Sequence, residues 1–422
     1  MKTITLDHIT KIEGHASLKL RIDKDKVKVC ELGSIVGARF FEGLLPGRPV
    51  KEAVEITSRI CGICSCAHTI CCLKAVENAL GIKVSEQTAV LRELITSGER
   101  IRSHASHLYF FALPDYFGYE SAIQMAGKNK EKIMTALNLI KIGNEIVRIF
   151  GGRDMHPFTS IEGGFTYVPD KEELKNLLKG LRSKKEEVIK TIQLFEKLNY
   201  PRFGTEREFM CMSKDTWTDE KIISNKGFET RQEDYEKFIE EKIEAHSTAK
   251  FAVKKEGEYM VGALARLSII KDLDKEIKSA TKKSQIKFPS NNPFHNNFAQ
   301  AVEILYWINR AIAIMENNEF KKEEIKKPVR DTGRGIGAIE APRGLLFHDY
   351  TIKEGVIEKC NIITPTCQNL AMMELDIKNY VEQILEHKKL SKEKLVLEIE
   401  KLIRAYDPCF SCSTHFLEVR WV

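Results

Sequence analysis

The sequence predicts a mainly helical α+β protein. Three observations predict this class: long segments with the apolar spacing of amphipathic helices, an alternating segment near the N-terminus, and a glycine-spaced alternating segment late in the chain. Neither a repeat nor a clear linker divides the 422 residues. We therefore expect one body over 1–422 rather than the two to three domains that length alone suggests.

The two β regions lie at opposite ends of the sequence. Ser17–Ile22 and Val27–Leu32 alternate between apolar and polar residues, and the charged residues 23–26 between them form a turn. This pattern predicts a hairpin within a β-containing N-terminal part, 1–48. Residues 335–364 are predicted to be β-rich, because glycines precede alternating runs that continue past Pro342.

Helices dominate from Val50 onward. The segment 204–263 is mixed in pattern, and the charged segment 321–327 is typical of a solvated connector. Apolar periodicity predicts helices at 66–80, 86–112, 130–150, 170–197, 296–317, 367–388 and 391–405.

Composition excludes several classes of protein. The chain is 43% hydrophobic and 30% charged, which is typical of a globular protein and not of disordered, collagen-like or coiled-coil chains. The net charge of +6 is too small to indicate a nucleic-acid binder. The first residues lack the apolar run of a signal peptide, and we expect no direct membrane span. We therefore expect a cytoplasmic protein, in which cysteines stay reduced.

The 11 cysteines are unusual for such a chain. Two Cys-x-x-Cys units, Cys61–Cys64 and Cys409–Cys412, lie 345 residues apart. Each unit directs both sulfurs to one point, and four thiolates form a soft site for zinc, iron–sulfur or nickel. Cys61 and Cys64 also precede a predicted helix, whose N-terminal dipole favours thiolates. A structural zinc site is the simplest interpretation, although zinc ribbons keep their pairs close in sequence.

The residues around the two units favour a different interpretation. Arg59 and His68 flank the first unit, while Asp407-Pro408 and His415 flank the second. This arrangement resembles the large subunit of cytosolic nickel–iron hydrogenases. Other segments resemble motifs of that family in the same order: Lys11–His15, Gly152–Pro157, Glu340–Gly344 and Pro365–Asn369.

The resemblance implies an enzyme, an oxidoreductase that splits dihydrogen reversibly into protons and electrons. It implies a nickel–iron centre whose iron carries carbon monoxide and cyanide, with Cys61 and Cys409 as terminal nickel ligands and Cys64 and Cys412 as bridging ligands. Cys409 is then the first proton acceptor. Glu13 matches the family's proton-relay glutamate; without the motif, a surface or capping carboxylate is the simpler interpretation.

Further site residues follow from the same resemblance. Arg343 matches the arginine above the metals, and Asp407 is expected to orient it by charge pairing. Pro342, Pro365 and Thr366 are expected to line the pocket of the cyanide and carbon monoxide ligands, with Thr366 bonding one cyanide. Two further residues, Glu42 and His415, are expected to hold a second divalent ion, magnesium or iron.

The resemblance also implies a central helical bundle and chain ends that meet at the metal site. Electrons are expected to leave through an iron–sulfur small subunit to further subunits of nicotinamide, deazaflavin or disulfide-reductase type. Residues 416–422 are expected to be removed by a maturation protease. Two alternatives remain: a related subunit of complex-I type, whose members lack the four cysteines, and a zinc-bound structural protein.

Overall fold

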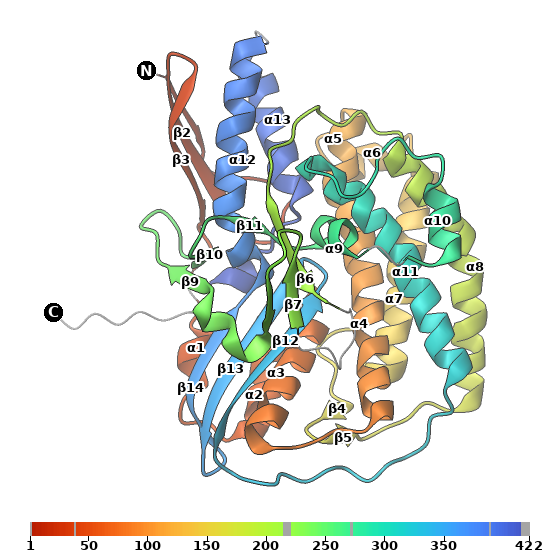
Figure 1. Cartoon of the computed structure of the whole chain (residues 1–422). Helices are drawn as coiled ribbons and strands as arrows, with labels where there is room; N and C mark the ends of the chain where they lie inside the picture. Colours follow the sequence, from red (N-terminus) through yellow and green to blue (C-terminus); the bar gives the residue numbers. More distant parts are fainter. Residues whose placement is uncertain (1, 38, 214–220, 271–272, 388–389, 415–422) are drawn as a thin grey trace, which may run out of the picture.

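A computed structural model describes residues 2–37, 39–213, 221–270, 273–387 and 390–414 (Figure 1). Long helices and several small sheets make up this part of the chain, which confirms the predicted α+β class. Within the described residues, none of the helices combines the length and the apolar content that a membrane crossing needs.

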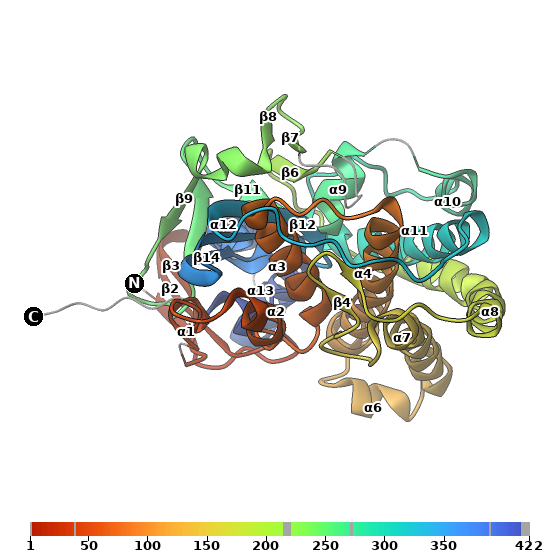
Figure 2. The same cartoon turned by 90° about the horizontal axis from the view of Figure 1, so that it is seen from below.

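Four long helices stand side by side and form the predicted bundle (Figures 1 and 2). Where two of them, α4 and α7, cross, a Cβ on Gly98 would lie 2.6 Å from the Gly143 carbonyl oxygen, so this close approach requires glycine. The four helices are α4 (Glu86–Ser106), α7 (Lys130–Gly151), α8 (Lys171–Glu196) and α11 (Asn296–Asn317).

The predicted N-terminal hairpin is confirmed as β2 (Ala16–Asp23) and β3 (Lys26–Ser34). A further strand, β1 (Lys2–Leu6), pairs antiparallel with β2. The sequence analysis did not predict it, because this short edge strand buries only the side chain of Ile4. At the opposite side of this sheet from β1, α12 (Pro365–His387) lies along β3.

The predicted β-rich segment forms a three-stranded antiparallel sheet of β12 (Gly333–Ala341), β13 (Gly344–Lys353) and β14 (Val356–Ile363). Its glycines let α3 (Ser65–Leu80) pack directly on β12, since a Cβ on Gly335 would lie 2.2 Å from a carbonyl oxygen of that helix. The sheet thereby supports the helix that begins at the first cysteine pair.

The predicted helix over 86–112 changes type before its end. The α-helical part ends at Ser106, and His107–Ala112 form a π-helical turn before α5 (Leu113–Phe117). Pro114 explains the change, because it has no N–H and its ring clashes with the carbonyl four residues earlier.

Shorter elements complete the described fold, and the mixed segment 204–263 holds short strands. The short helices are α1 (Phe41–Leu44), α2 (Val50–Ser58), α6 (Ala122–Ala126), α9 (Ala263–Ile269), α10 (Lys275–Thr281) and α13 (Lys392–Ala405). The short strands are β4 (Ser160–Ile161), β5 (Gly164–Phe165), β6 (Glu208–Met212), β7 (Lys221–Ser224), β8 (Glu229–Arg231), β9 (Ile239–Lys242), β10 (Phe251–Lys254) and β11 (Tyr259–Met260). Short 3-10 turns lie at Gln232–Lys237, Pro293–His295 and Ser411–Ser413.

Candidate metal centre

Four cysteines from distant parts of the chain meet at one point. Cys61 and Cys64 lie in the loop between α2 and α3, and Cys64 directly precedes α3. Cys409 and Cys412 lie in the loop after α13. All four Sγ atoms lie within 4.8 Å of one another. This confirms that the two ends of the chain meet at a four-cysteine site.

The spacing of the sulfur atoms suits metal ligands. The Sγ atoms of Cys61 and Cys409 are 3.6 Å apart, and the Sγ atom of Cys412 lies 3.0 Å from that of Cys64 and 2.9 Å from that of Cys409. None of the 11 cysteines, all of which lie among the described residues, forms a disulfide, and these four are buried. Metal–sulfur bonds of about 2.3 Å place sulfurs that share an ion roughly 3 to 4 Å apart. This soft donor set therefore fits nickel and iron, and also zinc.

The four thiols differ in acidity. Hydrogen bonds, first of all from Cys409, hold the pKa of the Cys61 thiol well below its usual range. Burial raises the pKa of Cys409 and Cys412 well above that range. A bound metal ion would displace the thiol protons of the cluster.

The N-terminal segment closes the site from one side. Glu13 forms a parallel bridge with Cys409, and its carbonyl accepts a hydrogen bond from the Phe410 N–H at 3.0 Å. Its carboxylate Oε2 accepts from the Cys409 thiol at 2.9 Å and from the Ser411 N–H at 3.1 Å. A proton on Cys409 is therefore in direct hydrogen-bond contact with a carboxylate.

Gly14 makes this close approach possible. Its φ is +79°, and a Cβ there would lie 2.9 Å from the Ser411 backbone nitrogen. We expect Gly14→Ala to destabilise the chain by about 2–4 kcal/mol, through left-handed strain and overpacking. Thermal unfolding should then begin several degrees lower, and metal content should fall with it. Gly37→Ala is the matched control, since a Cβ at Gly37 meets nothing within 4 Å; equal unfolding temperatures for the two variants would contradict this explanation.

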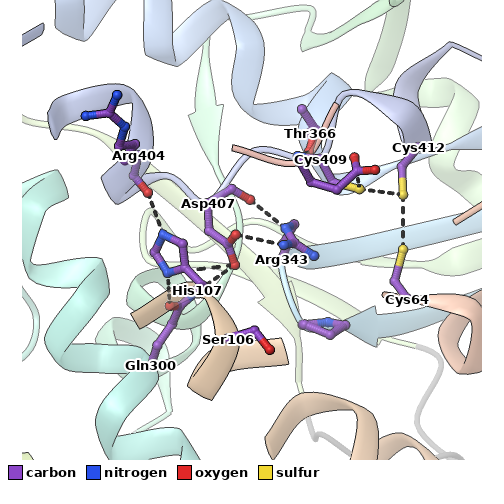
Figure 3. Close-up of polar contacts among 12 residues, drawn as sticks. Cys64, Ser106, His107, Gln300, Arg343, Thr366, Arg404, Asp407, Cys409 and Cys412 are labelled. Carbon is purple, nitrogen blue, oxygen red and sulfur yellow. Dashed lines mark hydrogen bonds and ion pairs between the residues drawn. The ribbon is translucent and has the colours of Figure 1, made fainter. Parts of the chain in front are cut away.

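A hairpin turn carries Arg343 over the cysteines (Figure 3). Pro342 and Arg343 are the two residues between the paired ends of β12 and β13. Nε of Arg343 donates to the Asp407 carbonyl at 2.6 Å, and Nη2 donates to Asp407 Oδ1 at 2.8 Å. The charge pair expected from the sequence is therefore present.

Arg343 stays charged although it is buried. Burial disfavours the guanidinium, but the Asp407 carboxylate and the cysteine sulfurs raise the pKa of Arg343 well above its usual range. Its Nη1 is buried and has no hydrogen-bond partner among the described residues. The Nη1 group of Arg343 therefore remains available to an acceptor beside the cysteines.

The sulfurs and Arg343 share a small cavity. Thr366, in the first turn of α12, accepts a hydrogen bond from the Cys409 N–H at 2.9 Å through Oγ1, which leaves its own O–H able to donate. The other lining residues include the expected pocket residues Pro342 and Pro365, together with Cys64, Cys409, Cys412, His68, Ala341 and Leu346.

Glu42 lies at a separate, strongly charged position. Its Oε1 accepts hydrogen bonds from the Lys250 ammonium at 2.9 Å and from the Ile362 N–H at 2.7 Å. Lys250 also pairs with Glu241 at 2.6 Å. A divalent ion at Glu42 would share this carboxylate with a lysine, which the sequence analysis did not foresee. The expected partner His415, and the segment 416–422, lie outside the described residues.

Other side chains fix the first cysteine loop. The His156 ring Nδ1 lies 2.8 Å from the Ser58 carbonyl, and the His156 N–H donates to Ser65 Oγ at 3.0 Å, so His156 joins the two sides of the loop. Arg59 instead extends into solvent and pairs with Glu55. His68 lines the cavity, and its Nδ1 lies 3.0 Å from His348 Nε2.

Two supporting residues were missed by the sequence analysis. Arg39 contacts the carbonyls of Ile60 and Arg59 at 2.5 Å and 3.0 Å. Glu99 on α4 accepts from the Cys66 and Ala67 N–H groups, at 2.6 Å and 3.0 Å, and thereby caps α3. Burial raises the pKa of Glu99 to about 7. Arg39 lies three residues before the predicted ion ligand Glu42, which was a usable signal, whereas the periodic pattern of α4 gave no signal for Glu99.

Comparisons with known proteins agree with this geometry. A family model described as nickel-dependent hydrogenase matches residues 39–137 and 295–415. The chain is 36% and 35% identical to the alpha subunits of sulfhydrogenase 1 and sulfhydrogenase 2 of Pyrococcus furiosus, over 99% of this chain and 98% and 100% of theirs. Its fold is similar to a crystal structure of NAD+-reducing [NiFe]-hydrogenase in the H2-reduced state, with a TM-score of 0.89, 24% identity, and coverage of 98% of this chain and 100% of the other.

Proposed function

This chain belongs to the nickel-dependent hydrogenase family and is a hydrogenase large subunit. From this premise we propose a role for each residue of its metal centre. The observation that carries the proposal is the cluster of four buried thiols, with Glu13 on one side and Arg343 on the other. Cys61, Cys64, Cys409 and Cys412 would hold the nickel–iron centre, with Cys61 and Cys409 as the terminal nickel ligands and Cys64 and Cys412 as the ligands that nickel and iron would share. Cys64, Cys412 and Cys409 line the cavity beneath Arg343, and Cys61 is not among its lining residues.

The bound centre supplies a Lewis acid with an open position that polarises dihydrogen for heterolytic cleavage. Cys409 holds the released proton on Sγ and donates it to Glu13 Oε2 along their 2.9 Å contact. The Ser411 N–H that binds the same oxygen keeps this carboxylate directed at the sulfur.

Arg343 and Thr366 would hold the carbon monoxide and cyanide ligands of the iron in the cavity. The Arg343 Nη1 without a partner among the described residues and the Thr366 hydroxyl are two donors that suit cyanide nitrogen atoms. Asp407 fixes the Arg343 guanidinium through two contacts, and Pro342 and Pro365 supply rigid apolar walls. The resulting pocket excludes water from the metals.

Glu42 is proposed to bind a second divalent ion together with His415. A carboxylate favours magnesium, whereas an imidazole is a common iron ligand, and either ion suits this pair. Lys250 lies 2.9 Å from Glu42 and so competes with the ion for the same oxygen atoms. The ion therefore needs more than the Glu42 carboxylate for tight binding.

Electrons leave through a partner that carries iron–sulfur clusters. Gly62, between the first two cysteines, is exposed, and so are the nearby apolar side chains of Met155 and Phe158. This exposed surface lies directly beside the first cysteine pair, so electrons would cross only a short distance, and it suits the docking of a small subunit. Further subunits of nicotinamide, deazaflavin or disulfide-reductase type would then accept the electrons, and a sulfhydrogenase and an NAD+-reducing enzyme are among the relatives.

We place the protein in the cytoplasm as a single domain over 1–422. Its 11 cysteines, all described and none in a disulfide, suit a reducing compartment, and the metal site unites segments from both ends of the chain. The structural zinc protein and the complex-I-type subunit are not favoured, because the chain matches nickel-dependent hydrogenases and keeps all four cysteines.

Elemental analysis of the anaerobically purified native complex tests the proposal. We expect about one nickel per chain, together with iron, because the soft sulfur set matches both metals. Treatment with a chelator after mild denaturation should remove the nickel and the dihydrogen oxidation activity together. One zinc per chain without nickel would instead support the structural alternative.

A further inference from the structure

A buried histidine lies beneath the Arg343–Asp407 pair (Figure 3). His107 is 1% exposed and opens the π-helical turn that follows α4. Its ring Nδ1 lies 2.5 Å from Gln300 Oε1, and its Nε2 lies 2.7 Å from the Arg404 carbonyl oxygen. The ring therefore bridges α11 and the end of α13.

The orientation of the Gln300 amide is determined by Asp407. Gln300 Nε2 donates to Asp407 Oδ2 at 3.0 Å, while Arg343 binds the other carboxylate oxygen. A reversed amide would place its oxygen against a carboxylate, which only accepts hydrogen bonds. Gln300 therefore presents its carbonyl oxygen, an acceptor, to His107.

Both ring nitrogens of His107 face acceptors. A neutral imidazole carries one N–H, and could satisfy only one of the two oxygens. Turning the ring over would place carbon atoms 2.5 Å and 2.7 Å from these oxygens, far inside the roughly 3.3 Å of the closest C–H···O contacts. The geometry accordingly requires a hydrogen atom on each nitrogen.

The charges around His107 suit a cation. The Arg404 carbonyl belongs to the last turn of α13, and the C-terminal end of a helix favours a positive group. Asp407 Oδ2 lies 4.0 Å from Nδ1, with Arg343 on the far side of that carboxylate. The Arg404 guanidinium points away from His107 and pairs with Asp115 at 2.7 Å. The Phe111 ring contacts the His107 ring in an edge-to-face arrangement.

We propose that His107 is a positioning residue of this metal centre that carries a hydrogen atom on both ring nitrogens. Together with Gln300 it holds Asp407 in place for Arg343, and its positive charge offsets part of the negative charge of the cysteine thiolates. His104, one helical turn earlier, is a natural comparison. Its Nε2 contacts Glu303 at 2.8 Å, its Nδ1 has no partner among the described residues, and burial lowers its pKa.

Nitrogen-15 NMR of the assembled enzyme, labelled at histidine, tests the protonation directly. His107→Gln and His104→Gln identify the two sets of resonances. We expect both ring nitrogens of His107 to carry hydrogen, because both face oxygen acceptors. His104 should show one protonated and one bare nitrogen. A bare nitrogen on His107 at neutral pH would overturn the proposal, whatever metal the site contains.

The midpoint potential of the metal centre tests the electrostatic role. His107→Gln removes a positive charge near the metals, so reduction should become less favourable and the potential should fall. His104→Gln removes no charge and should leave the potential unchanged. If both variants retain metal and the His107→Gln potential equals that of the wild type, the charge does not act on the centre and the proposed role is wrong.

Discussion

Replacing Cys409 with serine should abolish nickel retention and dihydrogen oxidation. Serine offers a hard, weakly acidic oxygen where a soft thiolate is needed, so the affinity for nickel collapses. Nickel should fall from about one per chain to near zero, as measured by elemental analysis, and activity should fall to background.

The fold should survive this substitution. A serine hydroxyl at position 409 can still donate to the Glu13 carboxylate, and the backbone bridge between residues 13 and 409 is unchanged. The unfolding temperature of the metal-free chain should therefore change little. Cys367→Ser is the matched control, because Cys367 is buried nearby and bonds to Thr364 outside the cluster. Loss of nickel in both variants would show that general disruption, and not ligand loss, is the cause.

Glu13→Gln should slow proton-dependent turnover by roughly 10²- to 10⁴-fold while the metals stay bound. Both site contacts of Glu13 use the single oxygen Oε2, and the amide oxygen of glutamine can accept both hydrogen bonds. An amide cannot take up the proton, however, so transfer from Cys409 stops there. Isotope exchange between dihydrogen and water measures this step directly.

A distant carboxylate serves as the control for this variant. Glu31 pairs with Lys19 at the surface, and Glu31→Gln should leave exchange unchanged. Glu13→Asp keeps the carboxylate at a longer reach and should fall between the wild type and Glu13→Gln. Full isotope exchange in Glu13→Gln would show that protons take another route.

The sequence predicted the fold and the site best where they depend on local residue patterns or on motifs in a fixed order. The long helices follow from apolar periodicity, and the contact between Arg343 and Asp407 was expected from motif order alone. The short strand β1 was missed because one buried side chain, Ile4, is too weak a pattern. The π-helical turn was missed because periodicity does not distinguish it from an α-helix.

The supporting side chains were harder to predict for a different reason. Glu99 caps a helix that begins 34 residues before it, and Lys250 reaches Glu42 across 208 positions. Such pairs exist only once the chain has folded, and neither Glu99 nor Lys250 has a sequence neighbour that marks it. In the sequence, a single charged residue that becomes buried on folding therefore cannot be distinguished from an ordinary charged surface residue.

The bridge between Glu13 and Cys409 has a consequence for biosynthesis. Cys61 and Cys64 leave the ribosome hundreds of residues before Cys409 and Cys412, so the complete set of four ligands exists only near the end of synthesis. Contacts of such high sequence separation form late, because the entropy of closing the loop must first be overcome. Metal delivery to this chain is therefore a post-translational event, which follows the docking of the segment with Cys409 and Cys412 against the segment with Glu13.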